Sequence, residues 1–364
     1  MSFSTDYQDI LAQIDAVDPV KYGKTRNFAD GAVTRLSPYI SRGVISTKIV
    51  LDKIQAVGYK HWEVTKFIQE LAWRDYWQQV WIAKGNAIDH DLKREQPDVD
   101  NYEMPAALAN AITEIDAVDE NINELYEGGY IHNHMRMYVA AIACNIGKSH
   151  WKVPARWMYY HLLDGDWASN ALSWQWVAGA NANKKYIANQ DNINKYFNSR
   201  QKRTFLDTSY EAIPEMDIPN ILANTTTPDL KTNLPKSTLT GIKTDQPTLI
   251  YNYYNLDPEW YKDEQVNRVL LLEPSHFDKY PVSDNCLNFV LRLAENIDDI
   301  SIYVGEFTDF VSEFKANNII YKEHPTNGHY RGKEESRDWM FNVTGYFPSF
   351  FGFWKKCERQ LKGK

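Results

Sequence analysis

The stretch Leu162-Leu163-Asp164-Gly165-Asp166-Trp167-Ala168-Ser169-Asn170 places two carboxylates and an amide in apolar and aromatic surroundings. A charge in such surroundings is costly unless it is paired. Arg136, within His132-Asn133-His134-Met135-Arg136-Met137, needs a carboxylate partner for the same reason. We therefore expect an ion pair between Arg136 and Asp164. The residues alone leave open whether it is only structural or part of a ligand site.

Length and composition limit the class of protein. At about 100–200 residues per domain, 364 residues predict two domains, and 24% charged and 43% hydrophobic residues are ordinary globular usage. No run approaches the ~18 apolar residues of a membrane span, and the first six residues lack the form of a signal peptide. We expect a soluble, cytoplasmic protein. The three cysteines are far apart, so neither a disulfide framework nor a metal site is expected.

Periodicity divides the chain into a helical part and an α/β part. Residues 1–212 show apolar residues at helical spacing, with helix starts expected at Ser37-Pro38 and after Ser46. Residues 213–246 are rich in proline pairs and predict a linker. Short β-branched runs alternate with helical segments over 247–364, which predicts a parallel sheet of Rossmann or flavodoxin type. The expected strands are 248–254, 268–273, 300–305 and 318–321, with helices at 286–297 and 307–315 and a partly helical segment at 338–361.

Charge is unevenly distributed. Residues 86–127 hold twelve acids and two bases, whereas the rest of residues 1–220 carries 21 bases against 16 acids. Overall acidity therefore does not exclude a nucleic-acid partner, because binding depends on a local basic face. The candidate face, which could equally be a solvated helix surface, comprises Lys184, Lys185, Lys195, Arg200, Lys202 and Arg203.

Common catalytic motifs are absent, and aromatic residues are abundant. The chain has no GxGxxG, GxxxxGK[ST], HExxH or GxSxG, which argues against their nucleotide, protease and hydrolase chemistries. It has 12 Trp, 23 Tyr and 15 Phe, and nine of the tryptophans fall between Trp62 and Trp176. Such rings could fill a core or stack on a planar ligand.

Four segments, in order, carry a resemblance to a known family. They are Val33–Tyr39, Phe67–Tyr76, His132–Met137 and Asp164–Trp176. In order and spacing they resemble the flavin-binding domain of the photolyase/cryptochrome family, across roughly 190 residues. The resemblance implies an all-helical domain that holds FAD in a folded, U-shaped form.

The resemblance also implies flavin contacts. Arg136 and Asp164 match the ion pair that flanks the flavin ring, Asp166 the carboxylate at its pyrimidine edge, and Asn170 the side chain at N5. An amide there can donate to one protonation state and accept from the other. A helix start with hydroxyl and N–H groups suits the diphosphate. The remaining matched cofactor contacts are Tyr22, Thr34, Leu36, Ser37, Phe67, Arg74 and Asn133.

The resemblance extends to DNA repair. Family members that split cyclobutane pyrimidine dimers flip the lesion out of the duplex against aromatic walls and a carboxylate. The matching residues are Glu70, Trp73, Asn133, Met137 and Trp176. Members that repair (6-4) lesions carry a His pair near the position of Asn133, so this sequence is similar to the cyclobutane type.

Electron supply departs from the family pattern. Trp174 and Trp151 match the first two tryptophans of the relay that reduces the flavin, whereas the third, exposed position aligns with Leu108. Trp157, Trp167 or a tyrosine could substitute. Val33 also replaces a common hydroxyl residue, which removes one phosphate hydrogen bond, about 0.5–1.5 kcal/mol.

Domain order departs as well, and three functions follow as hypotheses. Family members carry an α/β antenna domain before the flavin domain, whereas here a short α/β-like part follows it, with no identifiable antenna site. The leading hypothesis is a blue-light-dependent repair flavoprotein, a deoxyribodipyrimidine photo-lyase that acts on damaged DNA. The alternative is a cryptochrome-like receptor that signals through a protein partner bound to the α/β part. A third is a flavoprotein that only binds nucleic acid.

Overall fold

A five-stranded, all-parallel sheet forms the α/β part in the computed structural model, which describes residues 3–362. Its strands are β3 (Thr248–Tyr251), β4 (Asn267–Leu272), β5 (Ser301–Val304), β6 (Ile319–Lys322) and β7 (Lys333–Glu335). The four predicted strands and their parallel pairing are confirmed. Sequence reasoning missed β7, because its three charged or exposed residues carry no apolar signal.

The spatial order β5-β4-β3-β6-β7 is 3-2-1-4-5 in chain order. This is the Rossmann-type order with its switch point between β3 and β6, and it differs from the 2-1-3-4-5 order of flavodoxin. In register, Ile250 pairs with Val269 on one side and Tyr321 on the other.

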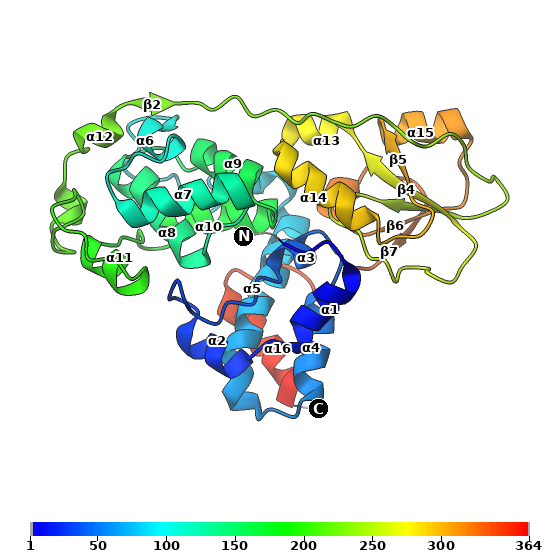
Figure 1. The fold of residues 1–364 in the computed structure, drawn as a ribbon, viewed down its shortest axis with the longest axis horizontal. Coiled ribbons are helices and arrows are strands. Elements are labelled where there is room, and N and C mark those ends of the chain that lie inside the picture. The colour runs from blue at the N-terminus through cyan, green and yellow to red at the C-terminus, as the bar shows by residue number, and fades with distance from the viewer. Residues whose placement is uncertain (1–2, 363–364) are drawn as a thin grey trace. The chain divides into compact units, whose positions relative to one another are not determined.

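Both faces of the sheet are buried, as the β-branched and leucine-rich strands require. Ile250, Val269 and Leu271 pack with Phe307 and Phe310 of α15 (Phe307–Phe314) in one hydrophobic cluster. On the alternate positions Leu249, Leu270 and Leu272 are also buried. Figure 1 shows α13 (Pro274–Lys279) and α14 (Asp284–Ala294) lying across the sheet from α15.

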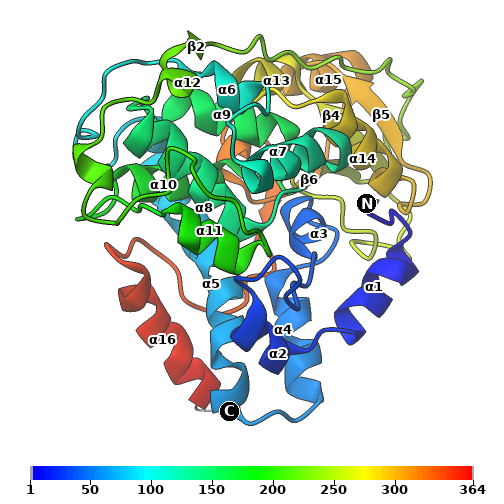
Figure 2. The same cartoon turned by 60° about the vertical axis from the view of Figure 1, so that its left-hand side comes forward.

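The N-terminal helices pack with this sheet. They are α1 (Tyr7–Asp15), α3 (Ser37–Ser41), α4 (Thr47–Ala56) and α5 (His61–Lys84). Tyr39 of α3 contacts Phe289 of α14, with ring centroids 6.1 Å apart. The expected helix starts are confirmed, since α3 begins at Ser37 with Pro38 in its first turn and Ser46 caps α4 by accepting from the Ile49 N–H. The C-terminal helix α16 (Phe350–Lys362) runs along α5 (Figure 2).

The remaining helices form a second compact unit. Its major helices are α7 (Asp116–Gly128), α8 (Asn133–Ala141), α9 (Lys152–His161), α10 (Trp167–Ala178) and α11 (Gln190–Tyr196). The smaller elements are α2 (Pro19–Thr25), η1 (Gly85–Asp89), β1 (Met104–Pro105), α6 (Ala106–Ala109), the π-helical turn η2 (Ile142–Ile146), η3 (Ile213–Glu215), α12 (Asn220–Ala223) and β2 (Thr225–Thr226); a 3-10 turn, η4 (Pro325–Asn327), follows β6.

The two compact units do not follow the boundary that composition predicts. The first unit contains the chain up to Pro19, Thr34–Ala83 and the chain from Lys231 onward. The second contains Val20–Val33 and Lys84–Leu230. Secondary structure changes from helical to α/β near the expected linker, but the helical segment 1–212 is shared between both units. No helix within residues 3–362 combines the length and apolarity needed to cross a bilayer.

Candidate flavin site

The expected ion pair is present in the second unit. Arg136 Nη2 donates to Asp164 Oδ2 at 2.9 Å, and Arg136 Nε donates to the Ile131 carbonyl at 2.9 Å. Asp164 is 5% exposed. The arginine is therefore fixed by its own helix start and by the loop between α9 and α10, and the predicted pairing is confirmed.

The start of α10 carries the other two polar residues of this stretch. Asp166 caps the helix by accepting from the Ser169 N–H at 2.7 Å, which holds the buried carboxylate in place. Asn170 Nδ2 donates to the Ala155 carbonyl of α9 at 2.8 Å. Within residues 3–362 the side-chain oxygen of Asn170 (Oδ1) accepts no hydrogen bond, and the buried Ser169 hydroxyl has no hydrogen-bond partner. The helix start therefore presents unused polar atoms beside two buried carboxylates.

The residues matched to the phosphate side lie mainly in the first unit. Thr34 accepts from Gln13 Nε2 through its carbonyl at 2.7 Å, and Leu36 is buried just before Ser37 opens α3. Arg74 of α5 donates to Ser41 Oγ at 2.6 Å. Tyr22 lies on α2, in the second unit.

The lesion-side matches on α5 have partners within their own unit. Glu70 forms an i,i+4 ion pair with Lys66 at 2.9 Å. Phe67, which is matched to the cofactor, is buried on the same helix. Trp73 stacks on Phe350 of α16, with centroids 3.8 Å apart and planes at 10°. One face of the Trp73 indole is therefore covered by the C-terminal helix, which the sequence did not predict.

The other lesion-side and relay matches lie in the second unit. Asn133 is exposed at the start of α8, Met137 is half-buried, and Trp176 is 40% exposed near Tyr186. Trp151 and Trp174 are buried. The flavin, lesion and relay roles of these residues stay predictions.

Sequence reasoning missed the acceptors that the buried tryptophans need. Trp151 Nε1 donates to Asp91 at 2.6 Å, and Trp167 Nε1 donates to Asp89 at 2.7 Å. Both aspartates belong to the acidic segment 86–127, whose composition indicates only an excess of acids. A buried indole N–H requires an acceptor, so the pairing of buried tryptophans with nearby acids is the signal that could have found them.

The donor set of the second unit fits the flavin ring. A carboxylate such as Asp166 can accept from a ring imide N–H, a guanidinium such as Arg136 can stabilise negative charge on the reduced ring, and the Asn170 amide has an unused acceptor. When bound, the flavin would supply the blue-light absorption and the electron that is passed to a substrate.

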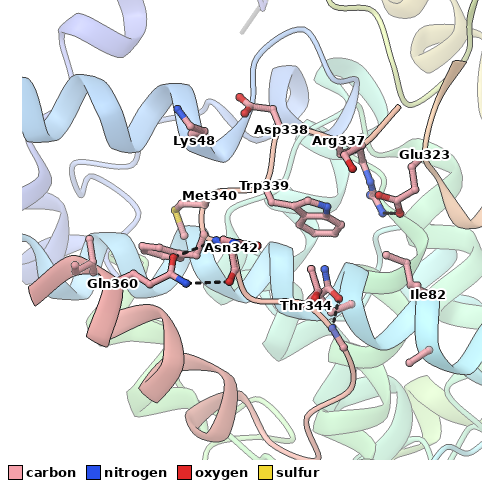
Figure 3. Close-up of a pocket in the computed structure, with 16 residues that line it drawn as sticks. Lys48, Ile82, Glu323, Arg337, Asp338, Trp339, Met340, Asn342, Thr344 and Gln360 are labelled. Atoms are coloured by element: carbon pink, nitrogen blue, oxygen red, sulfur yellow. Dashed lines mark hydrogen bonds and ion pairs between the residues drawn. The ribbon is translucent and has the colours of Figure 1, made fainter. Parts of the chain in front are cut away.

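A separate cavity of about 730 Å³ lies in the first unit between α4, α5, α16 and the segment 336–345 (Figure 3). The Arg337 guanidinium lies over the Trp339 ring at 4.5 Å and pairs with Glu323 at 3.1 Å. Lys48, at the same cavity, pairs with Asp52. None of the sequence-predicted site residues lines this cavity, and these three charged groups already have partners.

Comparisons with known proteins find similarity to photolyases and cryptochromes over part of the chain. Residues 67–215 match the family model of the FAD binding domain of DNA photolyase. A deoxyribodipyrimidine photo-lyase of Streptomyces griseus is 32% identical over 157 residues, which cover 42% of this chain and 33% of that protein. Cryptochrome DASH of Danio rerio is 30% identical over 190 residues, covering 49% and 34%. A Synechocystis sp. PCC6803 cryptochrome structure, 23% identical, covers 54% of this chain and 44% of that one with a TM-score of 0.48.

The family-model match defines the class of residues 67–215, which is that of a photolyase-type FAD-binding domain. Residues 67–215 carry the similarity to the photolyase/cryptochrome family. The chain spans about a third of the length of the curated relatives it matches.

Proposed function

We propose that this protein is a blue-light-dependent DNA repair flavoprotein that splits cyclobutane pyrimidine dimers. When bound and reduced, FAD would supply the light-driven electron for splitting; the two bonds of the cyclobutane ring would break and the electron would return, so the reaction is redox-neutral overall. Photo-lyases of Streptomyces griseus and Halobacterium salinarum, 32% and 28% identical in the matched region, support this assignment.

The protein residues supply position and electrostatics in this reaction. Arg136 holds compensating charge beside the flavin ring and is itself oriented by Asp164. Asn170 donates from its side-chain Nδ2 to the Ala155 carbonyl, which leaves its side-chain Oδ1 available for the ring. Glu70 meets the carbonyl groups of the dimer, and Trp176 offers a stacking surface for an unpaired base.

One observation carries the proposal, namely the contrast in exposure between the two carboxylates matched to the flavin and three of the residues matched to the lesion. The carboxylates matched to the flavin are buried, with Asp164 at 5% and Asp166 at 4% exposure. The residues matched to the lesion keep contact with solvent, including Asn133, Met137 and Trp176. A cofactor must be enclosed and a flipped base must enter from outside, so the buried carboxylates and these three solvent-accessible residues have the exposure that their roles require.

The test uses the FAD-loaded protein with chemically reduced flavin, which removes any dependence on the electron relay. Blue light and an oligonucleotide with a single dimer should yield intact pyrimidines. Glu70→Gln should lower the repair yield and retain FAD, whereas Glu124→Gln, an exposed glutamate of α7, serves as the matched control. A dimer that survives illumination while the flavin stays bound refutes repair.

A cryptochrome-like light receptor is the second candidate. The Trp73 stack on Phe350 favours it, because an indole face covered by α16 is closed to a DNA base. The 30% identity to Cryptochrome DASH of Danio rerio favours it equally. A receptor would retain FAD and change its light-dependent binding to a protein partner while leaving the dimer intact.

A further inference from the structure

The electron relay expected from sequence has no surface terminus at the aligned position. Leu108 is fully buried and cannot be oxidised. Two of the substitutes considered, Trp157 and Trp167, are each 1% exposed. Neither therefore brings an electron from solvent, and the exit from Trp151 must involve another side chain.

Tyr102 lies where such an exit is needed. Its ring stacks on His150, with centroids 5.2 Å apart and planes at 26°, and His150 lies 5.6 Å from the Trp151 ring. Tyr102 is 70% exposed, whereas Trp151 is fully buried. His150 therefore bridges a buried indole and a phenol in contact with solvent.

Hydrogen bonds fix this arrangement. Asp91 Oδ1 accepts from Trp151 Nε1 at 2.6 Å and lies 3.2 Å from His150 Nε2. His150 Nδ1 accepts from the Lys152 N–H at 3.3 Å, so its proton resides on Nε2 and is donated to Asp91. One carboxylate thus orients both rings, and its negative charge stabilises a cation formed on the indole.

We propose that Tyr102 is the terminal electron donor of this chain's relay, reached from Trp151 through His150. The inference rests on the proposed flavin photochemistry. When bound, oxidised FAD would supply the light-driven electron acceptor, and Trp174 would give up an electron to it and be refilled from Trp151. Trp151 is refilled from Tyr102, whose phenolic proton goes to solvent. An external thiol then returns one hydrogen atom to the tyrosyl radical, so electrons and protons balance.

The indole proton has a defined place during these steps. When Trp151 is oxidised, its Nε1 proton can move along the 2.6 Å bond to Asp91 and return on reduction. The competing route runs from Trp157 Nε1, which donates to Tyr126 Oη at 3.0 Å. That phenol donates to the Ala109 carbonyl at 2.5 Å, which hinders loss of its proton to solvent.

The experiment compares Tyr102→Phe with two matched controls in the FAD-loaded protein. Blue light with a thiol present should bleach the oxidised-flavin absorbance in wild type, and frozen samples illuminated without thiol should show a tyrosyl radical by electron paramagnetic resonance. Tyr102→Phe should lose the radical signal and slow bleaching about tenfold or more. Tyr210→Phe, an exposed tyrosine outside the relay, and Tyr126→Phe should behave as wild type.

Two results would overturn the assignment. One is wild-type bleaching and an unchanged radical in Tyr102→Phe, and the other is loss of both in Tyr126→Phe, which would place the exit beyond Trp157. Dimer repair by wild type with chemically reduced flavin is measured separately. If that repair fails while Tyr102→Phe still loses the radical, the proposed function is wrong and the relay assignment stands.

Discussion

His276 gives the stability of the first unit a defined dependence on pH. It lies on α13 among Tyr253, Tyr254 and Tyr280, with ring centroids 5.5–6.1 Å away, and within residues 3–362 its Nε2 has no hydrogen-bond partner. Burial, with further contributions from Arg42, Lys279 and His329, lowers the pKa of His276 from 6.5 to about 3. The imidazole is therefore neutral in the folded protein at every pH above that value.

The sign and size of the effect follow from linkage. Between pH 6.5 and 3 the unfolded chain binds a proton at His276 that the folded chain does not, so the free energy of unfolding falls as the pH falls. The slope is about 1.4 kcal/mol per pH unit. From pH 7.5 to pH 5 the loss due to His276 is therefore about 2 kcal/mol.

The perturbation is His276→Leu, which keeps an apolar side chain of similar size and removes the titrating group. Urea unfolding followed by circular dichroism at pH 7.5 and pH 5 gives the acid-induced loss of stability for each protein. The loss should be about 2 kcal/mol smaller in His276→Leu than in wild type. The same change at His90, which is exposed, is the control. An equal acid-induced loss in His276→Leu and wild type would refute the reasoning.

Three further substitutions test close packing and the ion pair. Gly43→Ala should lower the free energy of unfolding by about 2 kcal/mol or more, because its φ is +65° and a Cβ would lie 2.4 Å from a backbone carbonyl oxygen. Gly58→Ala is the control: its φ is +85° but a Cβ there would have open space, so the cost should be only about 1 kcal/mol. Urea unfolding measures both. Phe350→Ala should lower the free energy of unfolding by about 3 kcal/mol, because Phe350 is buried. Phe351 is 66% exposed, so Phe351→Ala should cost about 0.5 kcal/mol or less. Equal losses would show that α16 does not pack as described. Arg136→Ala removes the ion-pair partner of the buried Asp164 carboxylate. The variant should lose FAD on gel filtration or lose about 2 kcal/mol of stability. Retention of both FAD and stability would contradict the role of the pair.

Features with a local signal were predictable from sequence. Runs of β-branched residues predict the strands that begin near residues 248, 268, 300 and 318. The hydroxyl of Ser46 predicts the helix cap at that position. The Arg136–Asp164 pair followed from the cost of an unpaired buried charge. In each case the physical cause lies within a short segment or in one pairing rule.

Features set by distant packing were not predictable. Nothing near Trp73 indicates that Phe350, far along the chain, covers its ring. Tyr102 and His150 also lie far apart in sequence, and their rings come into contact only in the folded protein. The partner of a side chain across the structure has no local signature, so these contacts had to be observed.

The carboxyl edge of the sheet explains why the compact units cross the sequence boundary. Ligands of open α/β sheets bind outside this edge where the strand order reverses, here between β3 and β6. In this chain the buried Arg42 guanidinium lies 3.7 Å from the Tyr253 ring, and Tyr254 stacks on His324 at 4.2 Å. The Leu256 N–H donates to the Arg42 carbonyl at 2.9 Å, which fastens the loop after α3 to this edge. The carboxyl edge of the sheet therefore contacts the loop after α3, and this contact, together with the stacking of Trp73 on Phe350, joins residues 34–83 to residues 231–362 in one compact unit.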